Sequence, residues 1–224
     1  MPSSTVENYL KAIYHGQSDL PNGRDLVPMG QLAAALNVVP GTATTMVKAL
    51  AEAGLVTYEP YAGVRLTQAG ALLAAMVLRR HRLVELFLVQ VMGMSWTEVH
   101  DEAEQLEHVV SDRLIERMDE MLGRPSVDPH GDPIPSAEGA LDHREYHTLL
   151  DCPLGRHAIV TRVLDQDPDF LRFVEQSDLK PGQHLEVEAR DKASDSVRVS
   201  VKEHRAITLG TRAASKLLVE VVAS

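Results

Sequence analysis

The sequence predicts a mainly α-helical protein with a small β domain at its C-terminal end. Apolar residues recur at helical spacing through most of residues 4–122. A segment rich in proline and glycine, GRPSVDPHGDPIPSAEG, then interrupts helix formation at residues 123–139. From residue 154 onward, short segments alternate between polar and apolar side chains, as strands do when one face is buried. We therefore expect helical structure first and a small β-barrel last.

The N-terminal segment predicts a winged helix-turn-helix. Helices are expected at residues 4–16, 29–36 and 41–53, and LVTYEP and VRLT are expected to pair as a hairpin around YAG. In this motif the second helix of the pair presents its first residues to base edges, while hydroxyl and basic groups contact phosphates. The expected DNA contacts are Gly41, Thr42, Thr44, Thr45, Lys48 and Arg65. A winged helix used only for protein contacts is the alternative.

Two long helical patterns follow, at residues 67–91 and 95–122. Each is too apolar along one stripe to stand alone, so we expect them to form a dimer interface. A two-fold dimer reads two half-sites of double-stranded DNA. Beyond the connector, strands are expected from HAIVTRVL, HLEVEARD, SVRVSVK, RAITLG and LLVEVV, and a short helix from PDFLRFVEQSDL.

Composition narrows the class of protein further. The net charge of −10 is concentrated in residues 81–150, which hold fifteen acidic and five basic side chains. The start lacks the features of a signal peptide and no long apolar run occurs, so we expect a cytoplasmic protein without a membrane span. The single cysteine, Cys152, excludes an intramolecular disulfide and a cysteine-rich zinc site.

The acidic segment contains a candidate metal site. In HDEAEQLEH, residues 100–108, the histidines and two glutamates fall within about 100° of one helix face. Two antiparallel helices could join them to a His–Glu pair four residues apart on the preceding helix. Imidazole and carboxylate are ligands of borderline and hard divalent cations. The predicted ligands are His81, Glu85, His100, Glu104, Glu107 and His108. A solvated helix face is the alternative.

The same residues argue against an enzyme. The chain contains no HExxH motif, no phosphate-binding loop and no nucleophile–base pair in a recognisable context. A predicted DNA-binding domain beside a predicted metal site favours regulation. A metal-handling protein, in which the metal is cargo and the winged helix is structural, is the rival hypothesis.

The order of winged helix, RRHRLVE, VHDEAEQLEH, DPHGDPIP and small β domain resembles the diphtheria-toxin-repressor and manganese-transport-repressor family over essentially the whole chain. The resemblance implies a metal-activated repressor of metal-uptake genes that binds operator DNA as a homodimer. It also implies a DNA-binding domain at residues 1–73, a helical metal-binding and dimerisation domain at 74–148, and an SH3-like domain at 149–224.

The resemblance further implies two metal sites. His81, Glu85 and His100 match the ancillary site, whereas Glu104, Glu107 and His108 match the regulatory site. Glu104 stands where the iron-responsive branch has a cysteine and the manganese branch a carboxylate. Oxygen and nitrogen ligands suffice for Mn²⁺, so manganese is favoured and Fe²⁺ is the alternative.

Three more ligands are implied by resemblance, and one residue departs from the family. Asn8 occupies the N-terminal ligand position, and Gln166 and Asp169 align with the third domain's contribution to the ancillary site. Lys11 stands where the two-domain manganese branch has a glutamate, and an ammonium group does not bind a hard cation at pH 7. We therefore expect two separate metal sites. Metal bound through Asn8 would tie the first helix to the dimerisation helices.

Overall fold

The structure, a computed structural model, describes residues 3–21, 24–141, 144–201 and 205–222. The chain divides into two compact units. The first unit comprises Met1–His81, Leu106–Val110 and Pro135–Leu141. The second unit comprises Arg82–Gln105, Ser111–Ile134 and Asp142–Ser224. Each unit is described by itself below.

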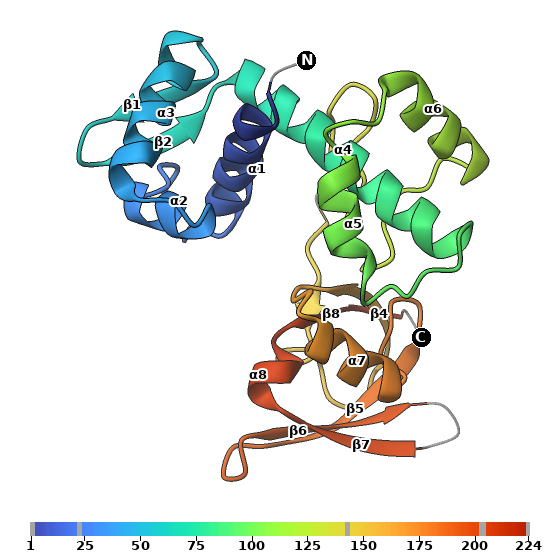
Figure 1. Ribbon diagram of the computed structural model, residues 1–224. Helices are drawn as coiled ribbons and strands as arrows, with labels where there is room; N and C mark the ends of the chain where they lie inside the picture. Colours follow the sequence, from blue (N-terminus) through green and yellow to red (C-terminus); the bar gives the residue numbers. More distant parts are fainter. Residues whose placement is uncertain (1–2, 22–23, 142–143, 202–204, 223–224) are drawn as a thin grey trace. The chain divides into compact units, whose positions relative to one another are not determined.

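The first unit contains the predicted winged helix-turn-helix, coloured blue to cyan in Figure 1. Ser3 caps the first helix by accepting a hydrogen bond from the Val6 N–H. Pro40 begins the third helix, at a position where its missing N–H has no helical partner to lose. The elements are α1 (Ser4–Ser18), α2 (Met29–Ala35), α3 (Pro40–Glu52), and the antiparallel strands β1 (Val56–Glu59) and β2 (Gly63–Leu66).

The core of the first unit is built from the apolar faces of these elements. Its buried members from α1 are Tyr9, Leu10 and Ile13. Val47 and Leu50 of α3 are also buried, as the helical spacing predicts. Because α1 contributes three buried side chains, its polar residues are held in fixed positions relative to α2 and α3.

The region predicted as one helix at residues 95–122 is two helices, so that prediction is wrong. They are α5 (Val99–Leu106) and α6 (Asp112–Met121). Ser111 ends the continuity because its hydroxyl accepts a hydrogen bond from the Leu114 N–H, 3.4 Å away, and caps α6. Two of the predicted ligands, Glu107 and His108, therefore lie in the turn after α5 and not on its face. The preceding helix, α4 (Gln68–Gln90), is continuous.

The second unit contains an antiparallel sheet of six strands in the order β3-β8-β4-β5-β6-β7. Over the residues that the structure describes, the outer strands β3 and β7 do not pair, so the sheet is open where a closed barrel was predicted. Closure fails because β3 has only two residues, and these pair with β8. The elements are β3 (His147–Thr148), β4 (His157–Val163), α7 (Pro168–Gln176), β5 (His184–Asp191), β6 (Ser196–Val201), β7 (Arg205–Gly210), α8 (Thr211–Ala214) and β8 (Leu217–Val221).

The core of the second unit joins the sheet to the helical segment that precedes it. Trp96, before α5, is 5% exposed and belongs to the same buried cluster as the sheet valines and Leu171 of α7. Val89 of α4 packs against this cluster. Trp96 therefore anchors the segment between α4 and α5 to the sheet. Among the described helices, none is long and apolar enough to cross a membrane.

Candidate metal centre

The DPHGDPIP segment, predicted only as a connector, is an ordered loop. Asp128 Oδ1 accepts hydrogen bonds from the backbone N–H groups of His130 and Asp132, at 2.8 and 2.9 Å. Gly131 has a φ of +86°, and a Cβ there would lie 1.9 Å from the Thr161 carbonyl oxygen. Only glycine fits this position. The loop is thus held against β4 with Asp128 and His130 in fixed orientations.

This loop brings Asp128 and His130 to Glu85 of α4. The three residues are 4%, 0% and 0% exposed, respectively. One ligand atom from each lies within 4.8 Å of the other two. Asp128 Oδ2 and His130 Nδ1 have no hydrogen-bond partner among the described residues. Buried polar atoms without partners are costly, so their convergence indicates a place for a bound cation.

Hydrogen bonding fixes which nitrogen of His130 can bind a metal. Its Nε2 lies 2.9 Å from the Trp96 carbonyl oxygen, which can only accept, so Nε2 carries the proton. In the neutral ring, Nδ1 then carries the lone pair, and it lies 3.7 Å from Glu85 Oε2. The ring also stacks on Trp96, with 5.4 Å between centroids. A backbone carbonyl that orients the far nitrogen is a common arrangement for a metal-binding histidine.

The electrostatics of these residues also suit a cation. Burial, together with the nearby carboxylates of Asp132 and Glu85, raises the pKa of Asp128 to about 7. Burial acts to lower the pKa of His130, but Glu85 and Asp128 outweigh it, and the pKa is raised. Arg82 Nε lies 3.8 Å from Asp128 Oδ2, too far for a hydrogen bond. Two buried carboxylates and one imidazole fit a divalent cation such as Mn²⁺ or Fe²⁺.

Other predicted ligands of the second unit lie beside Glu85. His100 Nδ1 is 3.3 Å from Glu85 Oε1, and His100 Nε2 is 3.8 Å from Glu104 Oε1. The side chains of His100 and Glu104 are 44% and 37% exposed, so they are open to solvent where Glu85 is not. His81 precedes Glu85 by one turn of α4. Glu85 therefore has neighbours from both the predicted set and the loop.

The remaining predicted ligands lie in the first unit, together with a residue that the sequence analysis missed. His81 Nδ1 lies 2.6 Å from Glu107 Oε2. His108 Nε2 is 3.4 Å from Glu107 Oε1, and His108 Nδ1 is 2.6 Å from Glu7 Oε2. Glu7 is 3% exposed and also accepts from Arg80 at 2.5 Å. The signal for Glu7 was its position three residues before buried Leu10, on the apolar face of α1.

Residues of α1 contribute two further polar groups to the first unit. Lys11 Nζ lies 2.8 and 3.0 Å from the two carboxylate oxygens of Glu107. Burial acts to raise the pKa of Glu107, but the hydrogen bond from His81 and the charge of Lys11 outweigh it, and the pKa is lowered. The side-chain oxygen of Asn8 is buried without a hydrogen-bond partner among the described residues. An orphaned amide oxygen is a suitable ligand for a hard cation.

The two ligands expected from the third domain lie in different surroundings. Gln166 Nε2 donates to Asp132 Oδ2 at 3.1 Å, so Gln166 contacts the DPHGDPIP loop. Asp169 is on α7, pairs with Arg172, and has an 88% exposed side chain.

The sequence analysis did not identify Asp128 and His130 as ligands. The available signal was that two acidic residues, Asp128 and Asp132, flank His130 within five residues.

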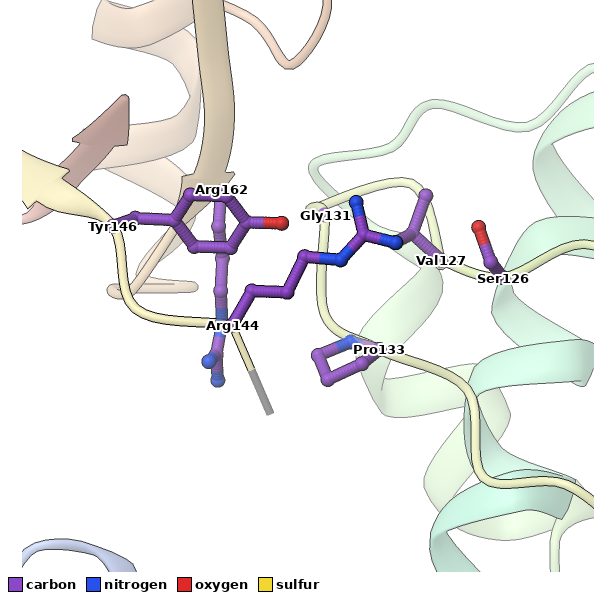
Figure 2. A pocket seen from close by; sticks show the side chains of 7 residues that line it. All are labelled: Ser126, Val127, Gly131, Pro133, Arg144, Tyr146 and Arg162. Carbon is purple, nitrogen blue, oxygen red and sulfur yellow. The ribbon is translucent and has the colours of Figure 1, made fainter. Parts of the chain in front are cut away.

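A small cavity of about 140 Å³ lies beside the same loop. Figure 2 shows Arg144 extended toward Val127, with the Tyr146 hydroxyl directed toward Gly131. Arg162 pairs with Asp132, and the lining includes none of Glu85, Asp128 and His130. The cavity is therefore separate from the candidate metal ligands.

The expected DNA contacts lie mainly on the outer face of α3. Gly41, Thr42, Thr45 and Lys48 are exposed, and Thr44 is half-buried. The hydroxyls of Thr44 and Thr45 donate to the backbone oxygens of Pro40 and Gly41, at 2.9 and 3.0 Å. Each hydroxyl oxygen can still accept a hydrogen bond. Arg65 of β2 pairs with Asp25.

Three known families match successive parts of the chain. Residues 1–64 match the family described as iron dependent repressor, N-terminal DNA binding domain. Residues 67–136 match iron dependent repressor, metal binding and dimerisation domain. Residues 147–221 match the FeoA domain.

Individual relatives agree with these matches. The iron-dependent repressor IdeR of Mycobacterium tuberculosis is 29% identical over 231 aligned positions, covering 97% of each chain. The diphtheria toxin repressor of Corynebacterium glutamicum is 33% identical over 159 positions, 68% of each chain. A solved structure described as a manganese-dependent transcriptional repressor complex with manganese has a TM-score of 0.86 at 38% identity, covering 97% of this chain and 100% of that one. The protein therefore belongs to the diphtheria-toxin-repressor and manganese-transport-repressor family of metal-dependent transcriptional repressors.

Proposed function

We propose that this protein is a manganese-activated repressor whose metal is held by Glu85, Asp128 and His130. The observation that carries the proposal is the buried convergence of these three side chains, with Asp128 Oδ2 and His130 Nδ1 lacking hydrogen-bond partners among the described residues. A divalent cation bound there would have two carboxylates and one imidazole as ligands. By resemblance, His81 and His100 are proposed as further ligands.

A second, regulatory site is proposed at Glu104, Glu107 and His108, with Asn8 as the ligand from α1. Glu7 supports this proposal because its carboxylate accepts from His108 Nδ1 and leaves Nε2 directed at Glu107. Gln166 acts through Asp132, by holding the DPHGDPIP loop. Asp169 remains a proposed ligand by resemblance alone.

The proposed metal is Mn²⁺, with Fe²⁺ as the alternative. All proposed donors are oxygen or imidazole nitrogen, and Glu104 provides a carboxylate where the iron branch has sulfur. The only thiol, Cys152, is buried in the core cluster of the second unit. One similar solved structure is named as manganese-dependent and contains manganese, whereas the relative IdeR of Mycobacterium tuberculosis is named as iron-dependent. Oxygen and imidazole ligands favour Mn²⁺ but can also bind Fe²⁺.

The DNA partner is proposed to be an operator of metal-uptake genes, bound by a cytoplasmic homodimer. Gly41, Thr42, Thr44, Thr45, Lys48 and Arg65 are the proposed DNA contacts. On α6, Leu114 and Met121 are 48% and 65% exposed and seven residues apart, which places them on one face suited to a two-fold interface. The proposed domains are 1–73, 74–148 and 149–224, near the limits of the three family matches.

The residues of the chain suggest how metal controls DNA binding. Without the cation, like charges on Glu85, Asp128 and Asp132 destabilise the conformation of the DPHGDPIP loop. In the first unit, Asn8 lies on α1, and α1 also supplies core side chains to the proposed DNA-binding domain. A coupling of about 1–3 kcal/mol would change operator affinity roughly 5- to 150-fold.

Fluorescence anisotropy of a labelled promoter fragment from a metal-uptake operon tests the proposal. Wild-type protein should bind with Mn²⁺ and dissociate with excess chelator, and His130→Gln should lose the response. His184→Gln, an exposed histidine of β5, is the matched control and should respond as wild type. Metal-dependent binding that survives in both His130→Gln and Glu85→Gln would reject this site. Titration with Fe²⁺ under anaerobic conditions compares the two ions.

A further inference from the structure

Lys11 forms a close ion pair with Glu107, one of the proposed metal ligands. Its ammonium nitrogen lies 2.8 and 3.0 Å from the two oxygens of Glu107. The side chains of Lys11 and Glu107 are 12% and 0% exposed. Water therefore screens this pair far less than it screens a surface ion pair. Both oxygens that Glu107 would offer to a metal already have a positive charge beside them.

The charges around Glu107 are balanced without a metal ion. Glu7 pairs with Arg80 at 2.5 Å, as Glu107 pairs with Lys11. Two carboxylates thus face two fixed cations, and the histidines His81 and His108 each lie 2.6 Å from one of these carboxylates. The set around Glu85, Asp128 and His130 in the second unit differs, because it keeps partnerless buried atoms among the described residues.

One face of α1 offers both a possible ligand and the competing cation. Asn8 and Lys11 are three residues apart on the helix and share a face. The Asn8 side-chain oxygen is buried without a hydrogen-bond partner among the described residues, which is an independent sign of a missing cation. Full use of this oxygen and of Glu107 by a metal would require the Lys11 ammonium to withdraw, since like charges repel at this distance.

We propose that Lys11 is an intramolecular competitor of the metal ion at Glu107 and sets the metal concentration at which the second site fills. This inference rests on the proposed function, because it assumes that Glu107 is a ligand. The buried Glu85 site fills first, and the Glu107 site fills at higher metal concentration, when Lys11 leaves the carboxylate. Because Lys11 lies on α1, occupancy of the second site is linked to the element that supports the DNA-binding core.

Isothermal titration of full-length protein with Mn²⁺ tests the inference in wild type and Lys11→Gln. The variant should bind the second ion more tightly by on the order of tenfold or more, with the first ion unchanged. Lys11→Arg keeps the charge and should behave as wild type. Lys216→Gln is the matched control, because it removes a lysine–carboxylate pair with Asp165 in the second unit. An unchanged or weaker second affinity in Lys11→Gln overturns the inference.

A measurement on wild-type protein keeps the inference falsifiable if Lys11→Gln does not fold. Acetylation of Lys11 by acetic anhydride, followed by mass spectrometry, should accelerate as the second Mn²⁺ binds, while acetylation of exposed Lys48 stays constant. Protection of Lys11 that persists with two ions bound overturns the inference. Normal Mn²⁺ binding without these Lys11 effects rejects this inference alone. No Mn²⁺ binding by wild type rejects the proposed function as well.

Discussion

Replacing Asp128 by asparagine should raise the stability of the metal-free protein and remove its response to Mn²⁺. Asp128 is 4% exposed, and its Oδ1 accepts two backbone hydrogen bonds that an asparagine oxygen preserves. The substitution removes only the charge and one oxygen ligand. The DPHGDPIP loop should therefore keep its conformation while the candidate site loses a metal-binding group.

The magnitude follows from the pKa of Asp128. This pKa is about 7 in the metal-free fold, against a usual value of 3.8. Between these values the folded state holds more protons than the unfolded state, so stability falls as pH rises through this window. At 1.36 kcal/mol per pH unit, the loss by pH 8 is at most about 4 kcal/mol. Asp128→Asn lacks this loss, so it should match wild type near pH 4 and exceed it at pH 8.

Urea unfolding of chelator-treated protein at pH 5 and pH 8, repeated with Mn²⁺, provides the assay. Manganese at 100 times its dissociation constant should stabilise wild type by about 2.7 kcal/mol and Asp128→Asn far less. Asp191→Asn is the control, because Asp191 also accepts backbone hydrogen bonds in a turn but is exposed. A metal-free Asp128→Asn that is less stable than wild type at pH 8, or that gains full stabilisation from Mn²⁺, refutes the reasoning.

Three other substitutions test separate parts of the structure. Glu7→Gln should lower the free energy of unfolding in urea by about 3–5 kcal/mol, because it removes the charged partner of the buried Arg80 guanidinium. A loss under about 1 kcal/mol would contradict a stabilising role for this ion pair. Gly131→Ala should destabilise by about 2 kcal/mol or more and weaken Mn²⁺ binding. Gly182→Ala, with similar φ but open space, should cost only about 1 kcal/mol; equal costs would exclude the contact as the cause. Lys48→Ala should reduce the slope of log affinity against log salt concentration for operator binding by about 0.9. Lys192→Ala removes an exposed lysine in the turn between β5 and β6 and should leave the slope unchanged; equal slopes in both variants would remove α3 from the interface.

The winged helix was predictable because its signals are local. The expected helix at residues 29–36 is Met29–Ala35, and the expected helix at 41–53 is Pro40–Glu52. The break between α5 and α6 was missed for a related reason. Leu106, Val110 and Leu114 continue the apolar spacing across the break, so hydrophobic periodicity alone predicts one helix. The capping serine at position 111 was the available local signal.

The candidate site was predictable only in part. Glu85 was identified from its helical spacing to His81, and the structure places His100 beside it. Asp128 and His130 come from a loop that has no periodicity, and no local rule says which helix that loop will contact. The open sheet was missed likewise, because barrel closure depends on how many backbone groups the first and last strands can pair.

The sequence by itself determined the chemistry of this protein: a DNA-binding motif, and carboxylate and imidazole groups in an acidic segment, residues 81–150, that contains no cysteine. Residue type and local spacing are enough for that, since both act within a few turns of chain. The tertiary structure decided which carboxylate oxygens lack a hydrogen-bond partner among the described residues and which carboxylates lie in contact with a fixed cation. Glu107 faces the ammonium of Lys11, whereas Asp128 lies buried beside other acids. This difference arises because electrostatic energies depend on burial and on distances of a few ångströms, which chain folding alone sets.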